Sequence, residues 1–451
     1  MVKAPIMAVS AIFKILDKGF EWSILTACCV TVLLSVVATL MVIVLPRFER
    51  VQKLIDKING VTRENLSGIR VIRAFNAEEY QTEKFDDVND ELTEMQMFNQ
   101  HSFAIMNPVM NLVMHGLTLG IYIIGALLIQ KAAMLDKINL FSNMVVFSSY
   151  GMHVIMSFLM LAMIFMMVPR AQISARRINE VFDEKISITN GTFDGDTQEN
   201  GSVEFKNVSF KYPDADEYVL KDISFKVEKG ETIAFIGSTG SGKSTLINLI
   251  PRFYDVSDGE VLVDGVNVKE YTLEALYNKL GYVPQKAVMF TGTVNSNVSY
   301  GDTGKEKASF KKIKEAIKIA QGAEFVEKME GQYDAHIARG GTNISGGQKQ
   351  RLAIARAIAR EPEIYIFDDS FSALDYKTDI NLRKELRKYT KNATNMIVAQ
   401  RIGTIINADK IVVLDNGECV GIGTHEELLK KCQVYKEIAL SQLSKEELEN
   451  A

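Results

Sequence analysis

Three long runs of apolar, uncharged residues occupy much of the first 170 positions. They are Trp22–Pro46, Met95–Gln130 and Ile138–Pro169, and none of them contains Asp, Glu, Lys or Arg. As a helix, the first run is about 37 Å long, enough to cross a hydrocarbon core of about 30 Å. Helices in soluble cores are rarely so long and so free of charge. The pattern therefore predicts three transmembrane helices, with a kink at Asn107-Pro108 in the second.

A fourth apolar run, Ala4–Phe13, is too short to span a bilayer by itself. It fits a short membrane-inserted helix. Alternatively, it is the end of a longer helix whose beginning lies outside this chain. A signal-peptide core is a third interpretation, but the long apolar run that follows favours insertion in the membrane.

The polar segment between the first two runs predicts the orientation. Residues 47–100 contain eight basic side chains: Arg47, Arg50, Lys53, Lys57, Arg63, Arg70, Arg73 and Lys84. Basic loops remain on the cytoplasmic side, so this segment and everything after residue 170 are expected there. The segment lacks proline and has helical periodicity, which predicts two helices that extend into the cytoplasm, with a turn near Gly68–Glu79.

The rest of the chain has the pattern of an α/β domain. Residues 181–200 are polar and rich in turn residues, so we expect a linker between a membrane domain at 1–180 and a second domain at 201–443, with a polar tail at 444–451. The net charge of −5 argues against a general nucleic-acid-binding protein. Cys28, Cys29, Cys419 and Cys432 follow neither metal-ligand nor disulfide spacing, which fits a reducing compartment.

The clearest chemical motif is a phosphate-binding loop between a predicted strand and a predicted helix. It consists of Gly237, Ser238, Thr239, Gly240, Ser241, Gly242, Lys243 and Ser244, and Thr245 continues into the helix. The glycines let backbone N–H groups surround phosphate oxygens, and the helix N-terminus adds its dipole. Lys243 is placed to reach the β- and γ-phosphates, while the Ser244 hydroxyl can ligate Mg²⁺.

A second strand, Ile364–Asp368, ends in a carboxylate suited to hold Mg²⁺, and Ser345-Gly346-Gly347-Gln348 precedes it. With these residues the chain resembles one half of an ATP-binding-cassette (ABC) exporter of the multidrug or lipid type. Further positions match the family in order: Tyr212 resembles the aromatic that stacks on adenine, Gln285 the Q-loop residue, Ser345–Gln348 the signature, and Asp375 the last residue of the D-loop.

The resemblance implies a multidomain fold, in which an α-helical transmembrane domain precedes an α/β P-loop nucleotide-binding domain. It implies ATP and Mg²⁺ as cofactors, with Ser244, Gln285 and Asp368 as the metal-binding residues. It also implies a multi-pass protein of the bacterial cytoplasmic membrane, with the nucleotide-binding domain in the cytoplasm. Family members work in pairs, and each ATP lies between the P-loop of one subunit and the signature of the other, so a second exporter half is the expected partner.

Two catalytic positions differ from the family pattern. Asp369 stands where the general-base glutamate is usual, and Gln400 stands where the switch histidine is usual. A carboxylate shortened by one methylene, beside an amide that carries no positive charge, predicts weakened hydrolysis. The signature is intact, which favours a heterodimer with a catalytically competent half over a homodimer.

The number of spans is the other departure. Three full spans and a short one match four of the six helices of a family member, so the chain is expected to be N-terminally truncated or to begin late. The main interpretation is an exporter subunit for an apolar or amphipathic drug, lipid or peptide. A nucleotide-gated sensor that binds ATP without pumping is the alternative, and a membrane-anchored P-loop kinase leaves the signature and Gln285 unexplained.

Overall fold

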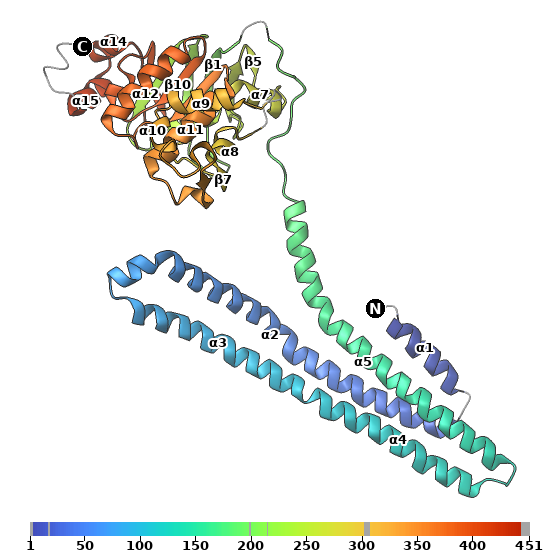
Figure 1. Cartoon of the computed structure of the whole chain (residues 1–451). Helices are drawn as coiled ribbons and strands as arrows, with labels where there is room; N and C mark the ends of the chain where they lie inside the picture. The colour runs from blue at the N-terminus through green and yellow to red at the C-terminus, as the bar shows by residue number, and fades with distance from the viewer. Residues whose placement is uncertain (1–2, 17–18, 198–199, 214, 302–306, 443–451) are drawn as a thin grey trace. The chain divides into compact units, whose positions relative to one another are not determined.

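The computed structural model describes residues 3–16, 19–197, 200–213, 215–301 and 307–442, which divide into two units at Lys185 and Ile186. Within its described residues, the first unit consists of helices joined by short turns. Its helices are α1 (Lys3–Leu16), α2 (Phe20–Ala74), α3 (Glu78–Ala104), α4 (Met106–Lys131) and α5 (Asp136–Phe182). Helices α2 and α3 lie side by side, as do α1 and α5 (Figure 1).

Three stretches of this unit are long and apolar enough to cross a membrane, as the sequence predicts. They lie in Phe20–Ala74, Glu78–Lys131 and Asp136–Leu161, and Pro5–Ile15 forms a shorter apolar helix. The single tryptophan, Trp22, is buried and donates its ring N–H to the carbonyl oxygen of Ile121 at 3.2 Å. This bond satisfies a polar group that has no water partner inside a bilayer.

The polar ends of α2 and α3 form the predicted helical hairpin, which turns at residues 75–77. Ion pairs join Arg50 to Glu91 and Glu64 to Lys84 across it, both at 2.9 Å. The helical path is interrupted at Ile105, slightly before the predicted kink at Asn107-Pro108. Pro108 has no N–H to donate to the carbonyl of Ala104, so the break appears one turn upstream of the proline.

Most of the segment expected to be a linker lies against the second unit. Phe193 forms a β-bridge with Tyr271 and packs edge-on against its ring. Arg252 donates to the carbonyl oxygen of Thr189 at 2.8 Å, and the Asp264 carboxylate accepts from the N–H of Ser202. Residues 189–197 and 200–202 are therefore attached to the α/β unit before its first strand begins.

The second unit contains two larger sheets and a two-stranded one. An antiparallel sheet has the order β2-β1-β4-β5, and a six-stranded sheet has the order β12-β11-β3-β10-β9-β6. Within the latter, β11, β3, β10, β9 and β6 are parallel, and β12 pairs antiparallel at one edge. The strands are β1 (Val203–Phe210), β2 (Leu220–Val227), β3 (Thr232–Gly237), β4 (Asp258–Val263), β5 (Val266–Asn267), β6 (Leu280–Val283), β7 (Gly292–Thr293), β8 (His336–Ile337), β9 (Ile364–Asp368), β10 (Thr394–Val398), β11 (Lys410–Asp415) and β12 (Glu418–Gly423).

Both faces of the parallel sheet are buried. Along β3, Ile233 and Phe235 pack into one core while Ala234 and Ile236 pack into another, following the two-residue period of a strand. The helices of this unit are α6 (Lys243–Asn248), α7 (Leu273–Lys279), α8 (Val294–Val298), α9 (Phe310–Ile319), α10 (Ala323–Val326), α11 (Gly346–Arg360), α12 (Tyr376–Tyr389), α13 (Ile402–Ile405), α14 (His425–Lys431) and α15 (Gln433–Gln442). The predicted fold class, a helical membrane domain followed by an α/β domain, is confirmed.

Candidate nucleotide-binding site

The predicted site residues follow four neighbouring parallel strands. The P-loop comes after β3, Gln400 closely after β10, Asp369 directly after β9, and Gln285 two residues after β6. Because the strands are parallel and adjacent, their carboxyl ends meet at one edge of the sheet. This is where open α/β sheets bind ligands.

The P-loop is organised around the Lys243 ammonium. It donates to the carbonyl oxygens of Gly237 at 2.9 Å and Ser238 at 2.6 Å, and to the Ser241 hydroxyl at 3.2 Å. Burial lowers the pKa of Lys243, and the carboxylates of Asp369 and Asp368 oppose that shift. The lysine is thus partly withdrawn from water in a loop that surrounds it with oxygen atoms.

Left-handed backbone conformations give the loop its shape. Gly240 and Gly242 have φ angles of 85° and 94°, which side chains of L-residues rarely allow. A Cβ on Gly242 would also lie 2.6 Å from the Leu220 side chain. Residues 238–240 form an exposed tip, and α6 begins at Lys243, so backbone N–H groups and a helix N-terminus converge here.

Ser244 and Asp368 form a direct pair. The Ser244 hydroxyl donates to the Asp368 carboxylate at 2.9 Å. Burial raises the pKa of Asp368, the Ser244 hydrogen bond opposes this shift, and the negative charge of Asp369 adds to it. Mg²⁺ prefers oxygen ligands. The Ser244 hydroxyl and the Asp368 carboxylate can supply two of them, and phosphates and waters can supply the rest. Within the described residues, His, Cys, Asp and Glu form no group of three or more that could hold a metal ion.

Asp369 occupies an unusual position beside this pair. Its φ angle is 44°, in the left-handed region, and its side chain is 8% exposed. The Gln400 amide donates to its carboxylate at 2.8 Å, and the Gln285 amide does so at 3.4 Å. Burial raises the pKa of Asp369, whereas hydrogen bonds from Ser372 and Gln285 act in the opposite direction. Asp369 and Gln400, the two positions at which the sequence predicts weakened catalysis, therefore contact each other.

A small cavity adjoins this carboxylate. It has a volume of about 10 Å³ and is lined by Asp369, Ser372, Gln400 and Thr404, among others. That volume is close to the minimum for one water molecule. Gln285, which was predicted to bind the metal, contacts Asp369 in this arrangement.

Tyr212 lies beside the first helix after the P-loop. Its hydroxyl shares a 3.0 Å hydrogen bond with the Thr245 hydroxyl. Its ring packs edge-on against Phe210 and Tyr254, at centroid distances of 5.0 and 5.2 Å. The ring is half-buried and fixed near the loop, as a platform for a planar base requires.

The signature residues begin α11. Ser345 accepts from the Gln348 N–H at 3.3 Å, and the Gln348 side chain accepts from the Ser345 N–H at 2.9 Å, which forms a capping box. A Cβ on Gly347 would lie 3.3 Å from the carbonyl oxygen of Ala373, so the signature packs against the D-loop. Asp375 caps α12 through the Thr378 N–H at 3.0 Å, and this contact lowers the pKa of Asp375. Among the described residues, the side-chain hydrogen bonds of Ser345 and Gln348 join these two residues to each other and do not reach the P-loop.

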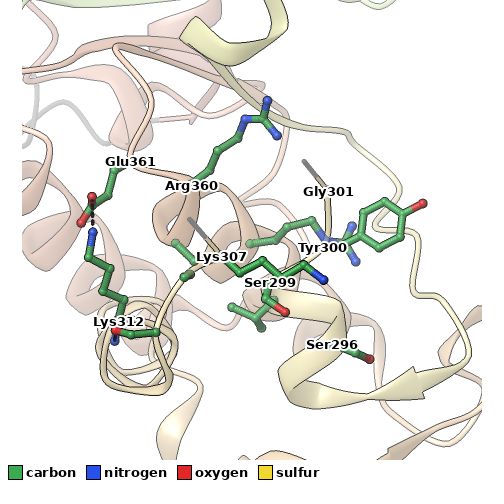
Figure 2. A pocket seen from close by; sticks show the side chains of 13 residues that line it. Ser296, Ser299, Tyr300, Gly301, Lys307, Lys312, Arg360 and Glu361 are labelled. Carbon is green, nitrogen blue, oxygen red and sulfur yellow. Dashed lines mark hydrogen bonds and ion pairs between the residues drawn. The ribbon is translucent and has the colours of Figure 1, made fainter. Parts of the chain in front are cut away.

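A larger cavity of about 940 Å³ lies elsewhere on the α/β unit (Figure 2). Lys312 and Glu361 form an ion pair of 2.7 Å at its edge. Arg356 packs against the ring of Tyr300 and donates to the carbonyl oxygen of Asn297 at 2.8 Å. The predicted nucleotide-binding residues do not line it, and no sequence motif pointed to it.

One further residue contacts the site, and no sequence motif predicts it because it lies far from the site in sequence. The Gln442 side chain bonds to the backbone at Gln400 and Ile402. Gln400 and Gln442 are 42 residues apart in sequence, so only the folded structure shows this contact.

Comparisons with known proteins agree with this geometry. The sequence profile described as ABC transporter matches residues 220–372, and the profile described as ABC transporter transmembrane region matches residues 1–158. An uncharacterized ABC transporter ATP-binding protein of Mycobacterium tuberculosis (strain H37Rv) is 41% identical over 451 residues, which cover 98% of this chain and 75% of the relative.

Two further relatives have named activities. The ATP-dependent lipid A-core flippase of Pseudomonas aeruginosa is 34% identical over 84% of this chain and 62% of its own length. A putative multidrug export ATP-binding/permease protein of Staphylococcus aureus (strain NCTC 8325) is 34% identical over 86% of this chain and 66% of its own length.

A solved structure supports the same assignment. It is a bacterial Atm1-family ABC exporter with ATP bound, with a TM-score of 0.84 and 26% identity over 99% of this chain and 77% of that chain. The chain is thus a multi-pass membrane protein with its nucleotide-binding domain in the cytoplasm. Its helical spans, its P-loop domain and these relatives together show that the chain belongs to the ABC transporter family, as an exporter half-transporter that binds ATP.

Proposed function

We propose that this chain is the subunit of a heterodimeric exporter whose own site retains ATP and hydrolyses it slowly. The exporter moves an apolar or amphipathic drug, lipid or peptide out across the cytoplasmic membrane. The named activities of the Pseudomonas and Staphylococcus relatives, lipid A-core flipping and putative multidrug export, support this substrate class.

ATP binding depends on the P-loop edge of the sheet. Lys243 and the loop N–H groups hold the phosphates, Tyr212 stacks on the base, and Ser244 with Asp368 holds Mg²⁺. Bound Mg²⁺ neutralises charge on the phosphates. Gln285 donates a hydrogen bond to Asp369, and through this contact its position depends on whether nucleotide is bound.

The contact between Asp369 and Gln400 is the observation that carries the proposal. A general base must reach the attacking water, and the aspartate side chain is one methylene shorter than glutamate, a retraction of about 1 Å. Displacement of that size can lower a rate on the order of a hundredfold. Gln400 already donates to the Asp369 carboxylate at 2.8 Å, and an amide neither accepts a proton at neutral pH nor carries a positive charge. The pocket therefore holds ATP and cleaves it poorly.

The intact signature gives this chain a second role. Ser345 begins a helix of 15 residues, so its N-terminal dipole favours an anion. A Cβ on Gly346 would meet no atom within 4 Å, which leaves room for a phosphate to approach the backbone. We assign Ser345–Gln348 to the ATP of a partner subunit that supplies its own glutamate and histidine.

Purification with and without the partner tests the proposal. The chain alone should bind ATP with weak hydrolysis, and a second exporter half that carries glutamate and histidine should restore turnover. ATPase activity from the chain alone at the level of the assembled pair would contradict a degenerate site.

A nucleotide-gated sensor is the second candidate, because Asp369 and Gln400 favour ATP retention. Inverted membrane vesicles that contain both halves distinguish the two. ATP-dependent accumulation of an amphipathic dye supports the exporter, whereas conformational change upon ATP binding without accumulation supports the sensor.

A further inference from the structure

Gln442, the last described residue of helix α15, bonds to the loop of Gln400. The Gln442 side-chain N–H donates to the carbonyl oxygen of Gln400 at 2.8 Å, and its side-chain oxygen accepts from the N–H of Ile402 at 2.9 Å. One amide thus uses its donor and its acceptor on two backbone groups of the same turn.

Helix α15 is firmly fixed to the domain. Tyr435 and Ala439 are fully buried, and the Tyr435 hydroxyl is 2.7 Å from Nδ1 of the buried His425. The helix contacts β3, β11 and α13. Gln442 therefore extends from an anchored element, although its own side chain is exposed.

The loop that Gln442 contacts contains a backbone N–H, that of Ile402, which needs a hydrogen-bond acceptor. Helix α13 begins at Ile402, and its N-cap residue Arg401 makes no side-chain capping hydrogen bond. The first N–H groups of a helix have no intrahelical partner. The Gln442 oxygen supplies that partner for Ile402, whose own side chain is completely buried.

We propose that Gln442 is a positioning residue that keeps ATP hydrolysis slow at this chain's own site. By holding the backbone of residues 400–402, it fixes the Gln400 side chain against the Asp369 carboxylate. It acts on backbone atoms, so it performs the same task whatever side chain stands at position 400. The inference rests on the proposed function, because it assumes that Asp369 and Gln400 face the bound ATP.

Three full-length variants test this role in lipid nanodiscs. Gln442→Ala removes both hydrogen bonds, and Gln442→Glu keeps the acceptor for Ile402 but loses the donor to Gln400. Gln433→Ala is the matched control, because the Gln433 amide bonds within α15 to Glu437. The readouts are hydrogen exchange of the peptide that contains Ile402, equilibrium ATP binding, the residual hydrolysis rate and the melting temperature.

Gln442→Ala should accelerate exchange at Ile402 and raise the residual hydrolysis rate about two- to tenfold, because losing a hydrogen bond of ordinary strength loosens the hold of Gln400 on the Asp369 carboxylate. ATP affinity and melting temperature should match those of Gln433→Ala, and Gln442→Glu should retain slow exchange at Ile402 with an intermediate rate.

Unchanged hydrogen exchange at Ile402 in Gln442→Ala would show that the Gln442 side chain does not hold the backbone of residues 400–402. Faster exchange with an unchanged hydrolysis rate would overturn the positioning role alone. Failure of the unaltered chain to bind ATP would overturn the proposed function, and the positioning role with it, while the exchange data would still report separately on the contact.

Discussion

At the residue scale, we propose that the carboxyl group of Asp369 sets how fast the site hydrolyses ATP. Its left-handed backbone conformation costs on the order of 1 kcal/mol for a non-glycine residue. Two side-chain amides approach its carboxylate, at 2.8 and 3.4 Å. The local structure therefore holds a short carboxylate in a fixed place beside an amide.

Restoring the family residues should raise hydrolysis only when both are changed. Asp369→Glu alone places a longer carboxylate against Gln400, and Gln400→His alone leaves the short carboxylate. Residues in contact give non-additive effects, so the double variant should exceed the product of the single effects. Single-turnover hydrolysis of the four forms measures this, with Lys243→Ala as the inactive control, and strictly multiplicative effects would contradict the pairing.

The raised pKa of Asp368 predicts a pH dependence of Mg²⁺ binding. Mg²⁺ requires the ionised carboxylate, and burial raises its pKa above the ordinary value of 3.8, so protons compete at a higher pH than for an exposed aspartate. Mg²⁺ affinity should therefore weaken as the solution is acidified toward that raised pKa. Titrations with a non-hydrolysable ATP analogue measure it.

Asp368→Asn is the matched control for that titration. It removes the carboxylate, so any pH dependence that remains belongs to the nucleotide and to other groups. Equal pH dependence in the two proteins would show that Asp368 does not control the competition between Mg²⁺ and protons.

At the element scale, we propose that the signature helix and the P-loop bind different nucleotides. Ser345→Ala breaks the capping box and should destabilise the start of α11 by about 1 kcal/mol. ATP binding at Lys243 should remain unchanged, while hydrolysis in the assembled pair should fall. Nucleotide affinity of the chain alone and ATPase activity of the pair check this, and reduced affinity in the chain alone would contradict the division of roles.

Local motifs allowed much of the element structure to be predicted. The P-loop pattern predicted a strand before Gly237 and a helix after Ser244, because glycine conformations and the phosphate site are set by adjacent residues; the helix in fact begins slightly earlier, at Lys243. The break at Ile105 was expected slightly later, because a proline acts on the carbonyl four positions before it. The contacts of Phe193 with Tyr271 and of Gln442 with Gln400 join residues far apart in sequence, so only tertiary packing reveals them.

At the scale of the whole molecule, hydropathy alone separated the membrane unit from the α/β unit. Charge-free runs longer than a bilayer core have few alternatives to spanning it, which is why that prediction held. Within the α/β unit, parallel strand order brings the P-loop, Asp369, Gln400 and Gln285 to one edge from positions more than 160 residues apart. Sequence motifs identify these residues, but the arrangement of the parallel strands is needed to explain why they lie together.

A pocket that keeps its nucleotide intact can be recognised by which nucleotide remains bound. The purified chain, without a partner, is incubated with Mg²⁺ and radiolabelled ATP, free nucleotide is removed quickly, and the bound label is separated by chromatography. ATP should predominate over ADP in the unaltered chain, and ADP should predominate in Asp369→Glu/Gln400→His. ADP as the main bound species in the unaltered chain would show that this pocket hydrolyses ATP readily.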